Sequence, residues 1–129
     1  MKKKTIKNLL LIGLLCLSGL TACSKEESIV TTPFSVGEIV TNIAQSSGKY
    51  LVSSVVIEVT DSKLIDNLTE RSYVVRDAVD GVLRQCTEEQ LKENDIKDEL
   101  REKILATLSD KFATKRIESV FFDKFTFQG

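Results

Sequence analysis

The chain has 129 residues, of which 42% are hydrophobic, and its 18 basic and 19 acidic side chains give a formal net charge of −1. It contains no histidine and no paired cysteines, and it has neither a P-loop nor a G-x-S-x-G elbow, which excludes His-based acid–base catalysis, Ser-His triads and most zinc sites. Carboxylate chemistry remains open, but no spacing singles out a pair, so we expect no catalytic residue, no metal, no cofactor and no small-molecule substrate.

The N-terminal segment has the order of parts of an export signal. Residues 1–8, MKKKTIKN, carry four lysines and no acid, and residues 9–20, LLLIGLLCLSGL, carry no charge. A helix that crosses a membrane needs roughly 20 apolar residues. This run is shorter, so a permanent membrane span is the weaker interpretation.

Leu20-Thr21-Ala22-Cys23 follows the apolar run and resembles the lipobox of bacterial lipoproteins, whose cysteine is lipidated before cleavage. The resemblance implies cleavage between Ala22 and Cys23 and lipid attachment at Cys23. Residues 1–22 would then be a lipoprotein signal peptide and residues 23–33 a lipidated tether on the extracytoplasmic or periplasmic side of a cell membrane. The alternatives are an ordinary signal peptide with an incidental cysteine and an uncleaved short anchor. In a cell with two membranes, the sequence is compatible with an anchor in the inner or in the outer membrane.

Removal of the signal changes both the charge and the cysteine count. It takes away four lysines, so 14 basic and 19 acidic residues remain and the formal charge of residues 23–129 is −5. Because an acidic domain repels phosphate groups, nucleic acid and anionic lipid surfaces are poor partners. Cys86 would be left without a disulfide partner. A half-buried structural thiol is the favoured interpretation of Cys86, and a reactive or intermolecular thiol is the alternative.

Two stretches rich in β-branched residues predict the first two strands. They are residues 34–43, FSVGEIVTNI, and residues 50–60, YLVSSVVIEVT. Residues 45–49 between them are polar and include a glycine, which favours a hairpin-like turn. Alternation in the second strand predicts a core face made of Leu51, Val55, Ile57 and Val59.

Helical patterns occupy the middle of the chain. Asp61 or Ser62 can cap an apolar stripe that extends to Leu83, with a break expected near residues 71–73. Thr87-Glu88-Glu89-Gln90 is a capping-box pattern and predicts a short helix. A further helix should begin at Asn94 or Asp95. Its expected buried side consists of Ile96, Leu100, Ile104, Leu108 and Phe112.

One set of charged residues on the first long stripe is a candidate contact surface. Arg76, Asp80 and Arg84 are successive i,i+4 neighbours, which predicts a charge ladder on the helix surface. Surface stabilisation is the simplest role for this ladder. Recognition by a partner is the alternative.

The last predicted element is a strand over residues 116–128. Alternation assigns Ile117, Phe121, Phe125 and Phe127 to the core and places Val120 and Phe122 on the other face. We expect Val120 and Phe122 to be covered by a neighbouring element or by another subunit, so they join the candidate interaction surface. The predicted fold class is α+β, a small antiparallel sheet of about three strands packed with two or three helices.

Residues 34–128 resemble the FliL family of flagellar basal-body-associated proteins through an ordered series of segments. These are residues 37–43, 49–53, 55–59, 75–83, 87–91, 100–104 and 117–122, followed by Phe125 and Gln128. The resemblance implies that residues 34–129 form a stomatin-like extracytoplasmic domain that assembles as a homo-oligomeric ring around the flagellar stator. Three features depart from the family pattern: the lipid on Cys23 in place of the usual transmembrane helix, Asp80-Gly81 in place of apolar residues, and Cys86 in place of a basic residue.

The role implied by this resemblance is that of a non-enzymatic flagellar motor accessory. Such a protein associates with the stator, stabilises or recruits it, and so supports swimming and swarming. The alternative is a general cell-envelope lipoprotein that binds a ligand or a partner protein unrelated to motility. An enzyme is the third hypothesis, and the absence of histidine and of a nucleophile motif argues against it.

Overall fold

The computed structural model describes residues 29–129 of the chain. The predicted signal peptide, the cleavage site between Ala22 and Cys23, and most of the predicted tether lie outside the described residues. Within residues 29–129, no helix combines the length and the apolar character that a membrane crossing requires.

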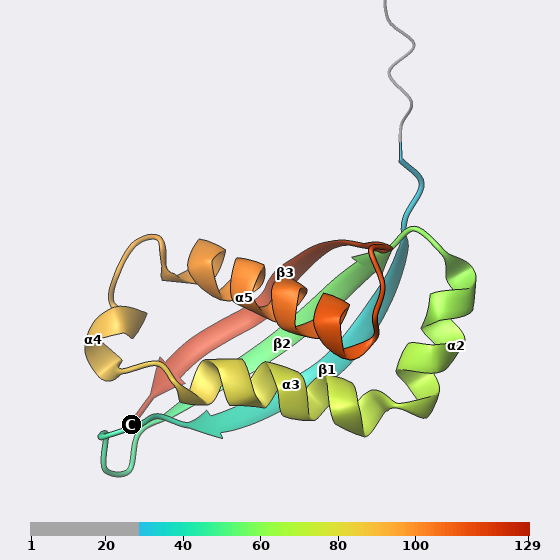
Figure 1. The fold of residues 1–129 in the computed structure, drawn as a ribbon. Coiled ribbons are helices and arrows are strands. Elements are labelled where there is room, and N and C mark those ends of the chain that lie inside the picture. The colour runs from blue at the N-terminus through green and yellow to red at the C-terminus, as the bar shows by residue number, and fades with distance from the viewer. Residues whose placement is uncertain (1–28) are drawn as a thin grey trace, which may run out of the picture.

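Three strands form one antiparallel sheet in the order β1-β2-β3, with β2 in the centre (Figure 1). The turn between β1 and β2 coincides with the predicted polar segment, where Gln45 and Gly48 adopt φ angles of 64° and 76°. The third strand returns to pair with β2 after the helices. The strands span Thr32–Asn42 (β1), Tyr50–Val59 (β2) and Ile117–Gln128 (β3).

The helices begin where the sequence supplies both an apolar stripe and a cap. Asp61 caps α2, and its carboxylate accepts a hydrogen bond from the backbone N–H of Lys63 at 3.0 Å. Thr87 and Gln90 form the predicted capping box of α4. Because the first stripe divides at Arg71, residues 29–129 contain four helices rather than two or three. They are α2 (Ser62–Glu70), α3 (Ser72–Arg84), α4 (Glu88–Leu91) and α5 (Ile96–Lys111).

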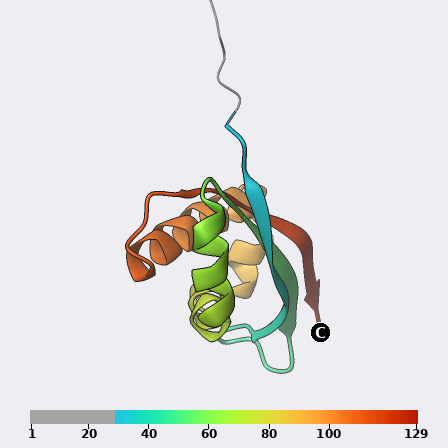
Figure 2. The same ribbon diagram turned by 90° about the vertical axis from the view of Figure 1, so that its right-hand side faces the viewer.

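The helices lie on one face of the sheet, which gives the predicted two-layer α+β fold (Figure 2). Helix α3 packs over β1, α5 packs over β3, and the two helices contact each other. The core lies between the two layers. It includes the predicted faces of β2 and α5: Leu51, Val55, Ile57, Val59, Ile96, Leu100, Ile104, Leu108 and Phe112.

The opposite face of the sheet has no helix over it among the described residues (Figure 2). Glu38 of β1 and Lys124 of β3 both pair with Ser54 of β2 and form an ion pair of 2.9 Å across this face. Val40 lies on the same face and is 60% exposed. This face is therefore mixed, because besides the ion pair it carries apolar side chains: Val52, which is buried, Val56, which is half-buried, and Val40.

Strand β3 contains two extra residues that the sequence pattern did not reveal. Its pairing with β2 shifts by one residue at Asp123 and again at Glu118. Each shift is a β-bulge, which moves the alternation of the following side chains by one position. Two shifts compensate each other, so Ile117, Phe125 and Phe127 remain on the predicted core side.

Between the two bulges the predicted faces are reversed. Val120 pairs with Ile57, which is in the core, and is only 5% exposed. Phe122 is partly buried against the same core, whereas Phe121 pairs with Val56 of the outer face. The prediction that Val120 and Phe122 face away from the core is therefore wrong. Within this domain, the neighbouring helices cover Val120, and it is not an available contact residue.

Candidate interaction surface

Arg76 of α3 binds the outer edge of β1. Strand β1 carries an extra residue between Ser35 and Gly37, and Gly37 adopts a φ angle of 82°, which glycine takes without strain. The Arg76 guanidinium donates hydrogen bonds to the backbone carbonyls of Val36 and Glu38, each at 2.9 Å. Arg76 therefore fixes the bulged part of β1 against the helix layer.

The predicted ladder of Arg76, Asp80 and Arg84 forms only in its second half. Asp80 and Arg84 make the expected i,i+4 ion pair. Arg76 does not join it in the described structure, because its donors are directed to β1, so the prediction of an Arg76–Asp80 pair is wrong. The other carboxylate oxygen of Asp80 accepts a hydrogen bond of 2.6 Å from Thr41, whose side chain is 1% exposed. Asp80 thus satisfies a buried hydroxyl and joins α3 to β1.

A hollow of about 410 Å³ lies beside the edge of β1, between Val40 and the first turns of α3. Two of the four exposed large apolar side chains in residues 29–129 line it, namely Val40 at 60% and Tyr73 at 70% exposure. Asp77, Asp80 and Arg76 supply its charged lining. The sequence reasoning missed Val40 and Tyr73. Val40 could have been noticed as an apolar residue on the polar side of a strand. Tyr73 could have been noticed as an aromatic residue at the expected break between two helices.

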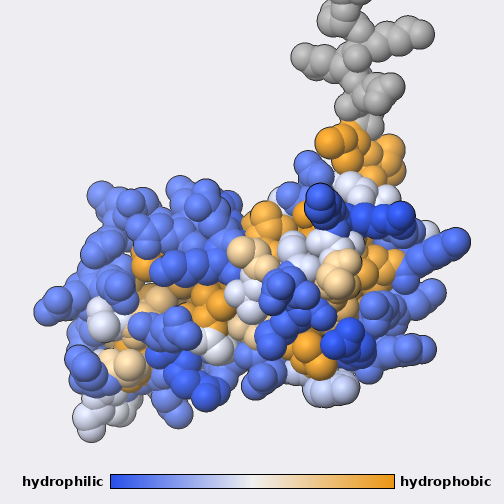
Figure 3. Space-filling model, viewed as in Figure 1, coloured by the Kyte–Doolittle hydropathy of each residue, from blue (hydrophilic) through white to orange (hydrophobic). Residues whose placement is uncertain are grey.

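A shallow groove of about 470 Å³ lies between α3 and α5. Ala78, Gly81 and Ala106 are among its small lining residues. An added side chain at Gly81 would meet no atom within 4 Å. The helical face accordingly shows patches of apolar surface between hydrophilic side chains (Figure 3). The missing side chain at Gly81 therefore contributes to the depression in this face.

Glu88 connects the β1–β2 turn to α4. Its carboxylate accepts hydrogen bonds from Lys49 at 2.6 Å and Ser46 at 2.9 Å, and Lys92 lies 3.4 Å away. The pKa of Glu88 is lowered to about 2, and the hydrogen bond from Lys49 contributes most to this shift, ahead of that from Ser46. The sequence marked Glu88 only as part of a capping box, because its partners lie about 40 residues away.

Cys86 is 5% exposed and lies in the core. Burial raises the pKa of its thiol, which keeps it in the uncharged, poorly nucleophilic form. Both observations favour the structural interpretation of this cysteine.

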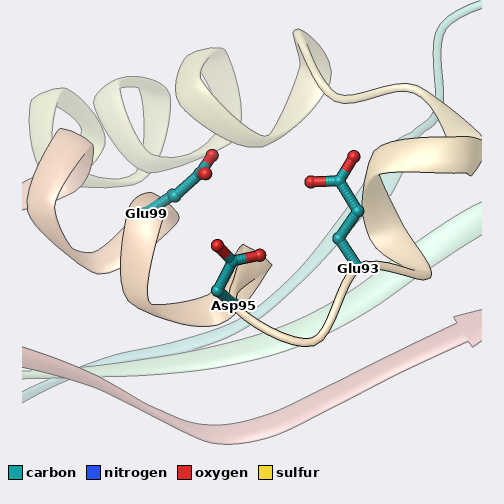
Figure 4. A group of neighbouring side chains, drawn as sticks. All are labelled: Glu93, Asp95 and Glu99. Atoms are coloured by element: carbon teal, nitrogen blue, oxygen red, sulfur yellow. The ribbon is translucent and has the colours of Figure 1, made fainter.

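Three carboxylates gather between the end of α4 and the start of α5 (Figure 4). The oxygens of Glu93, Asp95 and Glu99 lie within 4.8 Å of one another, and all three side chains are exposed. Exposed acidic groups commonly gather in this way without a cation. We assign no metal site to them.

Comparison with known families agrees with this architecture. The family model described as flagellar basal body-associated protein FliL matches residues 34–128, which is about three quarters of the chain. The match includes all four described helices and extends to the last residue of β3. A comparison with curated proteins gives no match. The chain therefore belongs to the family of flagellar basal body-associated FliL proteins.

Proposed function

We propose that this chain is a lipid-anchored accessory of the flagellar motor, which associates with the stator and helps to recruit or stabilise its torque-generating units. The observation that carries the proposal is the family match over residues 34–128. The surface supports a role in contact rather than chemistry, because it offers shallow hollows lined by apolar and charged side chains and the chain has no histidine. A ring of copies around the stator is part of the proposal.

The proposed anchor is a lipid on Cys23. The lipobox Leu20-Thr21-Ala22-Cys23 supports it. Two acyl chains, at about 0.8 kcal/mol per buried CH₂, hold a protein durably on a membrane. Strand β1 enters the domain at the end where β2 finishes and α2 begins, so this end of the sheet would face the membrane (Figure 1).

Metabolic labelling with an alkyne fatty acid tests the anchor. The wild-type chain should incorporate the label and Cys23→Ser should not. Cys86→Ser is the matched control, since it removes the other cysteine of the mature chain and should leave labelling unchanged. Label that persists in Cys23→Ser would refute the assignment.

Deletion of the gene tests the motor role. We expect slower swimming at high medium viscosity and reduced swarming, both restored by the wild-type gene. In-cell crosslinking should recover stator subunits and neighbouring copies of this chain. Unchanged motility at both low and high load would overturn the proposal and favour an envelope lipoprotein unrelated to motility.

A further inference from the structure

The outer edge of β1 carries main-chain groups that the sheet does not use. The carbonyls of Val36 and Glu38 point away from β2, since Arg76 of α3 donates to both of them. In an antiparallel pair, neighbouring residues direct their N–H and C=O groups to opposite sides of the strand. Val40 and Asn42 follow Glu38 at steps of two, so their main-chain groups also point outward.

The edge of β1 already has partners on both sides of residues 40–42. The N–H of Ile43 bonds to the carbonyl of Lys49 on the β2 side, which agrees with the alternation. One residue further, Ala44 forms an isolated parallel bridge with Thr87 on the helix side. Arg76 therefore occupies the edge just before residue 40, and Thr87 occupies it just after residue 42. The open part, which we call the β1 window, is the backbone of residues 40–42.

The side chains around the β1 window define what can bind there. Val40 and Tyr73 offer exposed apolar surface on the adjoining hollow. Asp77 lines the same hollow, is exposed, and forms no ion pair within residues 29–129. In the same part of the chain, no group outside the sheet bonds to the main chain of Val40 or Asn42.

We propose that the β1 window is a docking site for a short, extended segment of a partner protein that carries a basic residue flanked by apolar ones. The segment adds as a strand to β1 and takes up the main-chain groups of Val40 and Asn42. Its apolar side chains pack on Val40 and Tyr73, and its lysine or arginine pairs with Asp77. The proposal deepens the motor function by defining the docking surface, and it rests on that function for the identity of the partner.

Charge argues against a second copy of this chain as the occupant. Another copy could offer the free edge of β3 or its own β1 window, and pairing of two windows would bring the Asp77 side chains of both copies toward each other. Strand β3 carries the exposed carboxylates Asp123 and Glu118 at its two bulges, while its one basic residue, Lys124, already pairs with Glu38. Pairing of the two edges would bring these acids toward Asp77 and Asp80, where like charges repel. A basic segment of another protein has the complementary charge.

Hydrogen exchange of the chain as isolated from cell membranes tests the site with a defined probe. The probe is a capped heptapeptide of alternating threonine and valine with one central lysine, and its control replaces the lysine with glutamate. The lysine peptide at several millimolar should slow exchange of the Val40 and Asn42 amides roughly fivefold. No protection of these amides at that concentration would overturn the proposal.

Variants at Val40 separate strand addition from side-chain contact. Val40→Pro removes an outward N–H that no group outside the sheet uses within residues 29–129, and an edge strand tolerates proline at such a position. This change should abolish the protection of Asn42. Val40→Thr keeps the N–H and is the matched control, which should retain the protection. Asp77→Asn should weaken binding of the lysine peptide about two- to fivefold and leave the glutamate peptide unaffected or slightly tighter. Unchanged protection in Val40→Pro, or equal binding of both peptides to the wild type, would refute the site.

Two further measurements test the choice of partner and separate failure of the docking site from failure of the motor role. Sedimentation of the chain tests the second-copy occupant, and self-association that Val40→Pro abolishes would overturn the choice of partner. If gene deletion leaves motility unchanged while the peptide binds as described, the motor role fails and the site stands. If deletion impairs motility but the peptide gives no protection, the site fails and the motor role stands.

Discussion

The valine-to-alanine pair Val120→Ala and Val40→Ala tests the two bulges of β3. Val120 is 5% exposed and Val40 is 60% exposed, and both lie on edge strands of the same sheet. Each change removes two methyl groups and lowers the β propensity, so the difference between the two variants reports burial. At about 0.8 kcal/mol per buried carbon, Val120→Ala loses about 1.6 kcal/mol of transfer free energy. The cavity that remains raises the cost to roughly 2 to 3 kcal/mol.

Unfolding measurements read this difference directly. Val40→Ala should lower the free energy of unfolding by less than about 0.5 kcal/mol, as a surface substitution does. For a domain of this size, a loss of 2 kcal/mol lowers the Tm by roughly 8 °C or more. Urea unfolding followed by circular dichroism should show a lower midpoint for Val120→Ala with an unchanged slope.

Without the two bulges, unbroken alternation along β3 would place Val120 on the outer face of the sheet, away from the core. If Val120→Ala and Val40→Ala cost the same, with both variants folded, the bulges at Asp123 and Glu118 would be refuted. The register of β3, and with it the placement of Phe121 on the outer face, would then need to be reassigned.

Three other predictions follow from the contacts of single residues. Arg76→Met removes two hydrogen bonds from an exposed guanidinium and should cost about 1 kcal/mol in urea unfolding; a cost of only about 0.3 kcal/mol, that of an exposed i,i+4 ion pair with Asp80, would contradict the bonds to β1. The pKa of Glu88 is lowered, so its stabilisation is present above its ordinary pKa of 4.5 and is lost as the pH falls toward 2. The Tm of Glu88→Gln should therefore lie below that of the wild type at pH 7, and the gap should close toward pH 2; a gap that is independent of pH contradicts this. Cys86 should react with a thiol reagent slowly in buffer and rapidly in urea, and fast labelling of the native chain would refute its burial.

The fold class and most of the core could be predicted because the patterns that encode them are local. The rhythm of Ile96, Leu100, Ile104 and Leu108 spans several helical turns, and each of these residues is buried. Asp61 and Thr87 act as caps through bonds to residues two or three positions away. Such signals need no knowledge of the rest of the chain.

The bulges and the contacts of Arg76 could not be predicted in this way. An extra residue such as Asp123 changes the register of β3 without changing its composition, and only the pairing with β2 reveals it. For Arg76, the sequence offers Asp80 at i,i+4, but two carbonyls of β1 about 40 residues away accept its hydrogen bonds instead. Gly37, within a strand rich in β-branched residues, was the one local hint of the β1 bulge.

The β1 window is small, so a partner segment should bind it only weakly unless both proteins are held close together. Val40 and Asn42 offer four main-chain groups, and at about 1 kcal/mol net for each hydrogen bond they supply about 4 kcal/mol, so a free segment should bind with a Kd of roughly 1 mM. Two proteins held on one membrane meet at a far higher effective concentration than in solution, which makes such a weak site sufficient. If the lipid on Cys23 supplies this concentration, Cys23→Ser should abolish crosslinking to the stator even though the β1 window is intact. A transmembrane helix fused in place of the lipid should restore it, and failure of that fusion, with the domain folded and exported, would show that the lipid has a role beyond concentrating the chain.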